Sequence, residues 1–129
     1  MPDNKTFIRG YYERVFNGRE LDSIGEYWAD QRMVERVTKG CLSYFDSFPD
    51  LHISLEELIA EDDRVFVRST MTGTQDGEYK GIPPTGRNVA TDCAEVYRIA
   101  DGKIAGYWCL TNVAGLMRQL TEEPAPAIA

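Results

Sequence analysis

Glu95 is the residue of this chain best suited by type and position to move a proton. It lies within residues 91–112, where two runs rich in β-forming residues flank residues 100–102, the pattern of a β-hairpin. A carboxylate on a strand beneath apolar helices can serve as a general base. The sequence leaves a second interpretation open, in which Tyr107 or Arg68 satisfies Glu95 across the sheet and the role is structural.

The length of the hairpin loop decides which side chains share a face with Glu95, because a shift of one residue turns every side chain over. A two-residue turn would place Glu95 opposite Trp108 and leave both faces mixed. A three-residue loop, with Gly102 in the left-handed conformation, places Glu95 opposite Tyr107. We predict this second register because it separates an apolar face from a face that carries chemistry. On the second face it pairs Cys93 with Cys109 and Tyr97 with Ala105.

Several neighbours of Glu95 could take part in the same chemistry. Tyr107 and Tyr12 could donate hydrogen bonds to a developing enolate oxygen, although inward-facing aromatic residues are more often core. We expect Tyr97 to form part of the pocket wall. Arg68 could bind a substrate carbonyl or carboxylate, or it could pair with Glu95 or a surface acid.

Cys109 could act as a nucleophile or a weak acid, but the single histidine, His52, begins a different strand and is not arranged to activate it. Free cysteine is also among the most often buried residue types. We therefore expect Cys109 and Cys93 to line the pocket. The three cysteines of the chain form no CxxC pair, which favours a reducing compartment, and we expect the cytoplasm.

The opposite face of the hairpin is apolar and needs cover. Helices are expected on the first face, and a sheet face this hydrophobic is normally buried. We therefore predict a homodimer formed through this outer face. Its members are Ala94, Val96, Ile104, Gly106, Trp108 and Leu110, with Arg98 as the only charge.

The periodicity of the chain predicts the elements that position these residues. Apolar residues recur at helical spacing over residues 7–16, 21–28 and 32–47. From residue 51 the pattern changes to strands, which include residues 64–74 and a long strand from residue 88, and a last helical segment covers residues 113–120. Helices followed by antiparallel strands predict an α+β fold, a curved sheet with helices against one face. We expect one domain over residues 1–120 and a flexible tail over residues 121–129.

Charge and hydropathy disfavour two classes of partner. The 129 residues include 21 acidic and 14 basic side chains, a balance that disfavours nucleic acid and anionic membranes. No apolar run reaches the roughly 20 residues that a membrane span needs, and the N-terminal segment lacks the apolar region of a signal peptide.

Three segments together resemble the SnoaL-like polyketide cyclases (ester cyclases) of the nuclear transport factor 2-like superfamily. They are YYERVFNGRELDSIGEYWAD, the loop GIPPTGR, and the ending YRIADGKIAGYW…NVAGLMRQL, and the resemblance covers residues 7–120. It implies a cone-shaped, cystatin-like fold, in which a strongly bent antiparallel sheet wraps round N-terminal helices and encloses a pocket. It also implies a dimer, and an intramolecular aldol ring closure of an aromatic polyketide ester that uses no cofactor or metal.

The resemblance transfers the family's site only in part. The acid-base aspartate of the cyclases falls on Cys109, the histidine before it on Tyr107, and a second aspartate on Asn112, which we therefore expect to bind substrate. Glu95 occupies a position that the cyclases fill with histidine or an acid, and Cys93 matches a glutamine of some members. Tyr12 matches in position the oxyanion tyrosine of the ketosteroid isomerases. The short strand that the family usually inserts between residues 30 and 48 is missing here.

Two hypotheses follow. The first is an enzyme that cyclises or isomerises a polyketide-like or other polycyclic intermediate, with Glu95 as base and Tyr107 and Tyr12 stabilising the enolate. The second is a non-catalytic small-molecule binder of the same fold. The superfamily also implies a related hydroxylase or epoxide hydrolase as a further alternative.

Overall fold

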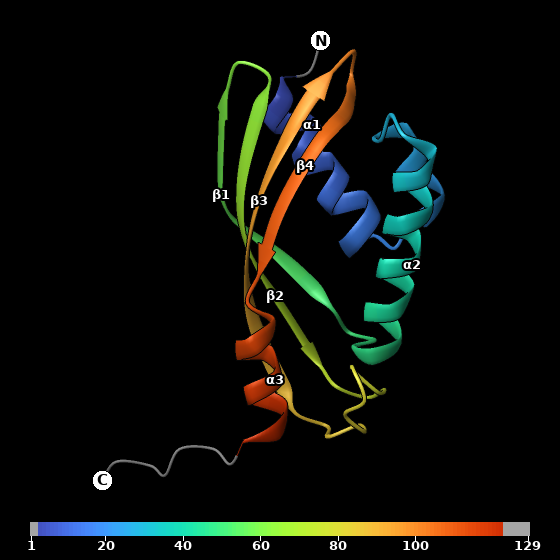
Figure 1. The fold of residues 1–129 in the computed structure, drawn as a ribbon, viewed down its shortest axis with the longest axis vertical. Coiled ribbons are helices and arrows are strands. Elements are labelled where there is room, and N and C mark those ends of the chain that lie inside the picture. Colours follow the sequence, from blue (N-terminus) through green and yellow to red (C-terminus); the bar gives the residue numbers. More distant parts are fainter. Residues whose placement is uncertain (1–2, 123–129) are drawn as a thin grey trace, which may run out of the picture.

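The computed structural model describes residues 3–122, which form helices and one sheet (Figure 1). The elements are α1 (Asn4–Tyr11), the π-helix η1 (Tyr12–Asn17), the 3-10 helix η2 (Leu21–Glu26), α2 (Gln31–Ser47), β1 (His52–Glu61), β2 (Arg64–Thr74), β3 (Asn88–Ala100), β4 (Lys103–Thr111) and α3 (Val113–Thr121). The residue expected to begin the C-terminal tail, Thr121, still belongs to α3, and residues 123–129 lie outside the described part of the chain.

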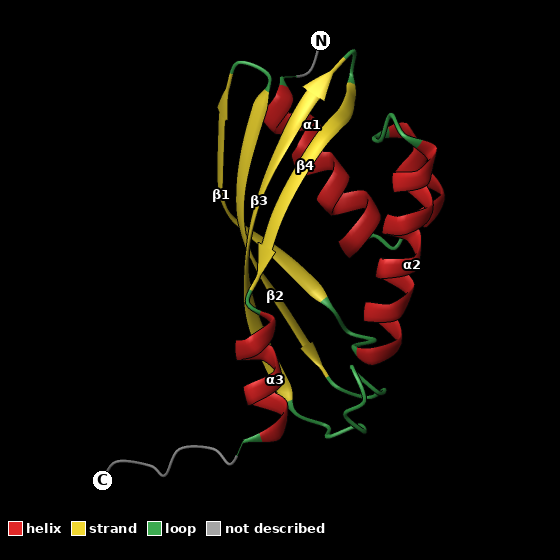
Figure 2. Ribbon diagram, viewed as in Figure 1, coloured by secondary structure: helices red, strands yellow, loops and turns green. Residues whose placement is uncertain are grey.

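The four strands form one antiparallel sheet in the order β1-β2-β3-β4. The sheet is strongly bent, and α1 and α2 lie on one side of it while α3 lies at one end (Figure 2). This arrangement confirms the predicted α+β cone. Within residues 3–122, none of the helices combines the length and the apolar character that crossing a bilayer requires.

The first helical segment begins at a capping residue, Asp3, and changes to a π-helix at Tyr12. Asp3 caps it, since its Oδ1 accepts a hydrogen bond of 2.7 Å from the backbone N–H of Thr6. The predicted helix over residues 7–16 is present, and at Tyr12 it changes to a π-helix, whose hydrogen bonds join residues five apart instead of four. Tyr11 and Tyr12 are neighbours in the chain, yet both are only 1% exposed.

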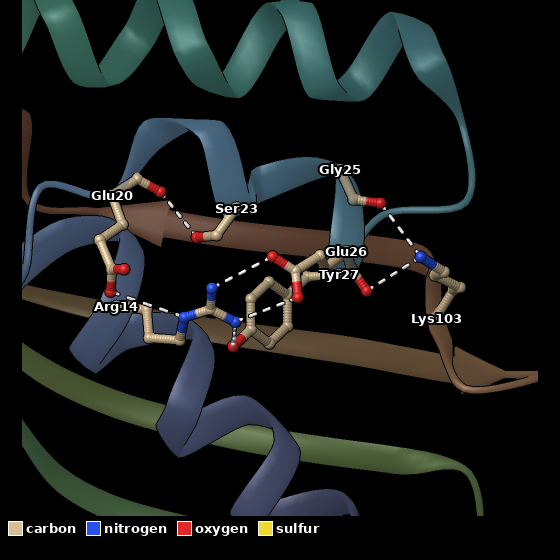
Figure 3. Close-up of polar contacts among 7 residues, drawn as sticks. All are labelled: Arg14, Glu20, Ser23, Gly25, Glu26, Tyr27 and Lys103. Atoms are coloured by element: carbon tan, nitrogen blue, oxygen red, sulfur yellow. Dashed lines mark hydrogen bonds and ion pairs between the residues drawn. The ribbon is translucent and has the colours of Figure 1, made fainter.

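A polar cluster holds η2 and the chain after it against β4 (Figure 3). The guanidinium of Arg14 makes two hydrogen bonds to the carboxylate of Glu26, at 3.2 and 3.1 Å, and a third to the hydroxyl of Tyr27. Lys103, the first residue of β4, donates to the carbonyl oxygens of Gly25 and Glu26, each at 3.0 Å. These contacts fix the segment that leads into the cavity wall.

The chain after η2 docks on β4 without a strand of its own. Trp28 forms a single parallel β-bridge with Ile104, supported by hydrogen bonds from Ala29 N–H to the Ile104 carbonyl and from Ile104 N–H to the Tyr27 carbonyl. Asp30 then caps α2, because its Oδ1 accepts from the backbone N–H of Arg32 at 2.8 Å. Between Asp30 and Phe48 the structure contains α2 and no strand.

The β3–β4 turn differs from the predicted three-residue loop. Asp101 and Gly102 have φ values of 52° and 74°, and Ala100 pairs with Lys103, so the turn has two residues. Positive φ at both central residues is the pattern of a type I′ turn, which Asp-Gly favours because its twist matches the flanking strands. The predicted three-residue loop, which would have paired Ile99 with Lys103, is therefore wrong.

A bulge in β4 changes the register beyond the turn. Ile99 pairs with Ile104 whereas Arg98 pairs with Gly106, so Ala105 is an extra residue in β4. As a result Glu95 lies opposite Cys109, where Tyr107 was predicted. Likewise Cys93 lies opposite Thr111 and Tyr97 opposite Tyr107.

Each of these β4 partners is displaced by two residues from the prediction, and an even displacement leaves the side chains on their predicted faces. Ile104 is the exception. It precedes the bulge and is 1% exposed within the core, whereas the sequence placed it on the outer face.

Gln75 organises the GIPPTGR segment. Its side chain is buried, and its amide donates to the carbonyl oxygens of Gly77 and Ile82 while its Oε1 accepts from the N–H and hydroxyl of Thr85. Arg87 at the end of the loop donates to the carbonyls of Gln119 and Glu122, beside the C-terminus of α3. The loop therefore ties β2 to α3.

Candidate functional site

A cavity of about 600 Å³ lies between the inner face of the sheet and the helices. Residues of α1, η1 and α2 line one side, and residues of all four strands line the other. Most of the lining is aromatic or aliphatic, and the few polar groups come mainly from β3 and β4. A cavity of this size and character suits a small molecule with a ring system.

The inner faces of β3 and β4 bring most of the expected site residues together. Lining the cavity are Glu95, Cys93 and Tyr97 of β3, and Tyr107, Cys109 and Thr111 of β4. Tyr12 joins them from η1. Because Glu95 and Cys109 are directly paired, their side chains leave neighbouring points of the same sheet face.

A chain of hydrogen bonds holds the carboxylate of Glu95. The hydroxyl of Tyr97 donates to Glu95 Oε2 at 2.5 Å, and the hydroxyls of Tyr12 and Tyr97 lie 2.8 Å apart. Since the single hydroxyl proton of Tyr97 points to Glu95, Tyr12 must donate to Tyr97. Both tyrosines are 1% exposed, so bulk water cannot replace these bonds.

The tyrosines around Glu95 stay protonated at neutral pH. Burial raises the pKa of Tyr97 and of Tyr12 well above 10, and the negative charge of Glu95 adds to the effect. Tyr107 is 44% exposed at the cavity edge, but partial burial and the charge of Glu95 also raise its pKa. All three hydroxyls are therefore neutral, and those of Tyr97 and Tyr12 already donate within the chain that holds Glu95.

The wall beside this chain is aromatic. The indole N–H of Trp28 donates to the hydroxyl of Tyr11 at 3.0 Å, and the Trp28 ring lies edge-on to Tyr97 and Tyr107 at centroid distances of 6.5 and 5.5 Å. Such edge-to-face contacts restrict the rings to few orientations. The donors therefore sit in a rigid frame.

The structure places Arg68 and Asn112 away from the cavity. Arg68 lies on the outer face of β2 opposite Ala94, and its Nε is 3.0 Å from Oε1 of Glu57. Of the alternatives considered for Arg68, the surface ion pair is the one observed. Asn112 caps α3, with its Oδ1 accepting from Gly115 N–H at 2.9 Å, so the expectation that it binds substrate is replaced by a structural role.

The cavity thiols differ in their surroundings. Burial raises the pKa of Cys93, although the hydroxyls of Thr111 and Ser69 act in the opposite direction. Burial also raises the pKa of Cys41 on α2 to about 11. Cys109 is exposed at the cavity edge. Within residues 3–122 no group of three or more His, Cys, Asp or Glu side chains is arranged to hold a metal ion.

Two lining residues of α2, Arg36 and Gly40, were not identified from the sequence. The apolar residues predicted at helical spacing over residues 32–47 include a stripe of Met33, Val37 and Cys41, and these three residues line the cavity. Arg36 and Gly40 precede Val37 and Cys41 by one position and flank the same stripe. The sequence signal that could have identified them is a polar and a small residue, four positions apart, beside an apolar helical stripe.

Comparison with known proteins agrees with the observed fold. The model of the SnoaL-like polyketide cyclase family matches residues 6–120. No curated protein matches the chain. Among solved structures, AclR from Streptomyces galilaeus, provisionally assigned as a hydroxylase, is 26% identical and has a TM-score of 0.80; the match covers 95% of this chain and 83% of AclR.

Two further structures from the same genus are similar. TsrD from Streptomyces laurentii is 27% identical with a TM-score of 0.78, and the match covers 94% of this chain and 98% of TsrD. IdmH from Streptomyces antibioticus, provisionally assigned as a polyketide cyclase, is 24% identical with a TM-score of 0.77, covering 89% of this chain and 96% of IdmH. At that identity the likeness to IdmH concerns the fold alone.

Proposed function

Because the chain belongs to the SnoaL-like polyketide cyclase family, we propose that it is a cofactor-independent enzyme that moves a proton next to a carbonyl group. Its substrate is a polyketide-like or other polycyclic natural-product intermediate, and the reaction is an intramolecular aldol cyclisation or an isomerisation. The observation that carries this proposal is the carboxylate of Glu95, held by Tyr97 inside a largely apolar cavity.

Glu95 acts as the base. Tyr97 bonds its Oε2, and its Oε1 accepts a proton from the substrate carbon next to the carbonyl. The electron pair of the broken C–H bond forms an enolate. In a cyclisation the enolate carbon attacks a second carbonyl, and the protonated Glu95 returns the proton to the alkoxide that forms.

Tyr107 stabilises the enolate oxygen. Its hydroxyl is a neutral donor on the same sheet face as Glu95, which is what an oxyanion site requires. Tyr12 has a different role from the one expected, because its proton is used in the bond to Tyr97. We assign Tyr12 to positioning Tyr97, and through it the carboxylate.

The strand register supports Glu95 of β3 as the base in place of the family's aspartate, which belongs to β4. Cys109 occupies the position of the family's aspartate, and Glu95 is its direct partner across the two strands. The Cβ atoms of such partners are about 5 Å apart. A carboxylate on Glu95 can therefore reach nearly the same part of the cavity as a carboxylate on residue 109 would.

Replacement of Glu95 and Cys109 tests the proposal. With aromatic polyketide esters as substrates, Glu95→Gln should lower turnover by about a hundredfold to ten-thousandfold, the usual contribution of a general base, while Cys109→Ala should cost little. Glu57→Gln is the matched control, since Glu57 is an acid on the outer face. An inactive Cys109→Ala with an unaffected Glu95→Gln would show that the base was assigned to the wrong strand.

Two alternatives have specific support. Hydroxylation is favoured by the 26% identity to AclR. Binding without catalysis is favoured by the replacement of the family's aspartate with Cys109. Cys109→Asp separates the second alternative from the enzyme, because restoring the family's acid should add aldol activity to a protein that lost it.

We further propose that the protein is a homodimer in a reducing compartment such as the cytoplasm. The outer sheet face and its border expose large apolar side chains, with Ile59, Trp108 and Leu110 at 57%, 55% and 61%. A contiguous surface of this kind is normally covered by a partner. The three free cysteines support the reducing compartment.

A further inference from the structure

We propose that the ligand of this cavity carries an anionic group, of the carboxylate class, which Arg36 binds at the cavity edge while the ring system lies inside. This inference rests on the proposed function and narrows its substrate class to those polycyclic intermediates that carry a carboxylate. Two residues of α2, Arg36 and Gly40, carry it.

Arg36 is the one basic side chain among the described residues that line the cavity. It is exposed, and within residues 3–122 it makes no ion pair and no side-chain hydrogen bond. Its neighbours one helical turn away, at three and four positions, include no acid. They are Arg32, Met33, Lys39 and Gly40. The guanidinium is therefore free to bind a ligand.

Gly40 leaves the cavity edge open beside this guanidinium. It lies four residues after Arg36, on the same side of α2, and it lines the cavity. Glycine inside a helix is unfavourable relative to alanine, yet packing does not require it here, because a Cβ at Gly40 would meet nothing within 4 Å. The missing side chain gives a ligand access to the cavity next to Arg36.

The distribution of charge gives an anionic ligand one orientation. Within residues 3–122 the cavity lining holds one carboxylate, on Glu95, and one guanidinium, on Arg36. An anionic group is repelled by the first and attracted by the second, and a guanidinium binds a carboxylate through two parallel hydrogen bonds. The reacting part of the ligand is thereby directed to Glu95. The net charge of −7 makes non-specific attraction of anions weak, so a local cation is needed.

A matched pair of dyes tests the inference. 8-Anilinonaphthalene-1-sulfonate and N-phenyl-1-naphthylamine share one aromatic skeleton, and only the first has an anionic group. In fluorescence titrations Arg36→Gln should raise the Kd of the sulfonate dye about five- to thirtyfold, the range for a partly exposed hydrogen bond to a charge, and change that of the neutral dye less than twofold.

Arg32→Gln is the control. Arg32 lies one turn earlier on the same helix, pairs with Asp30 and does not line the cavity, so both dyes should bind that variant as they bind the native protein. Gly40→Phe should weaken both dyes, because the phenyl ring fills the open edge.

The inference is overturned if Arg36→Gln weakens both dyes equally or leaves the sulfonate dye unchanged. It is also overturned if Gly40→Phe binds the neutral dye as tightly as the native protein does. These results do not depend on turnover, so a failure here is distinct from a failure of Glu95 as the base. If Arg36→Gln weakens the sulfonate dye selectively while Glu95→Gln keeps full turnover, Arg36 is the anion site and Glu95 is not the base.

Discussion

Tyr97→Phe should destabilise the protein by more than a buried hydroxyl usually contributes. The substitution removes the donor to Glu95 Oε2 at 2.5 Å and also the acceptor for Tyr12 at 2.8 Å. A bond to a charged group contributes about 1.5–3 kcal/mol and a neutral one about 0.5–1.5 kcal/mol. With both tyrosines 1% exposed, we expect the free energy of unfolding to fall by about 2–4 kcal/mol.

Urea unfolding at neutral pH, followed by circular dichroism, measures this loss. Tyr44→Phe is the control, because the Tyr44 hydroxyl lies 3.3 Å from that of Tyr79 and neither group is charged. That variant should lose less than about 1 kcal/mol. Comparing the losses in free energy of unfolding of the two variants separates the contribution of the bond to the charged carboxylate from the general effect of deleting a hydroxyl.

A double-mutant cycle isolates the bond itself. A charge-assisted bond is about twice as strong as a neutral one, so Tyr97→Phe should cost about 1 kcal/mol less in the Glu95→Gln background than in the native protein. An equal cost in both backgrounds would refute the reasoning, because the Tyr97 hydroxyl would then not be holding a carboxylate.

Two further predictions concern association and alkaline pH. Trp108→Glu puts a charge into the outer sheet face and should give monomers or insoluble protein by light scattering; a dimer that persists would place the interface elsewhere. Burial raises the pKa of Tyr12 and Tyr97 above the unfolded value of 10, so their contribution to stability is complete below pH 10 and is lost as the pH rises further. Phenolate absorbance at 295 nm from these residues should therefore rise only together with unfolding, and complete ionisation of all seven tyrosines before any loss of circular dichroism would contradict this.

Periodicity predicted the elements well because each has one buried face. The order of helices and strands, the curved sheet with helices against one face, and the inner position of Glu95, Cys93 and Cys109 follow from the spacing of apolar residues, whereas the cone was implied by the resemblance to the family. The register did not follow, although Asp101-Gly102 is a strong signal for a two-residue turn. Ala105 is a small residue with no sequence feature that marks it as the extra residue of a bulge.

Two side chains expected in the site have other roles in the structure, and two residues that line the cavity were not identified from the sequence. Arg68 could have belonged to either face until the β2 pairing was known, and its partner Glu57 follows another bulge, in β1. Asn112 stands directly after a strand and before a helix, where a capping role was the simpler interpretation. Arg36 and Gly40 acquire meaning only because α2 faces a cavity rather than a filled core.

The bulge at Ala105 also affects how relatives of this chain are to be compared. Ile104 already pairs with Ile99, and Gly106 with Arg98, so a chain lacking residue 105 would keep every later pair, including Glu95 with Cys109. Loss of one residue at this point therefore leaves the same side chains facing the cavity. For a relative that is one residue shorter here, an alignment should place the gap at residue 105 and match residue 109 by its partner on β3, because counting from the turn would assign the wrong side chain to the site.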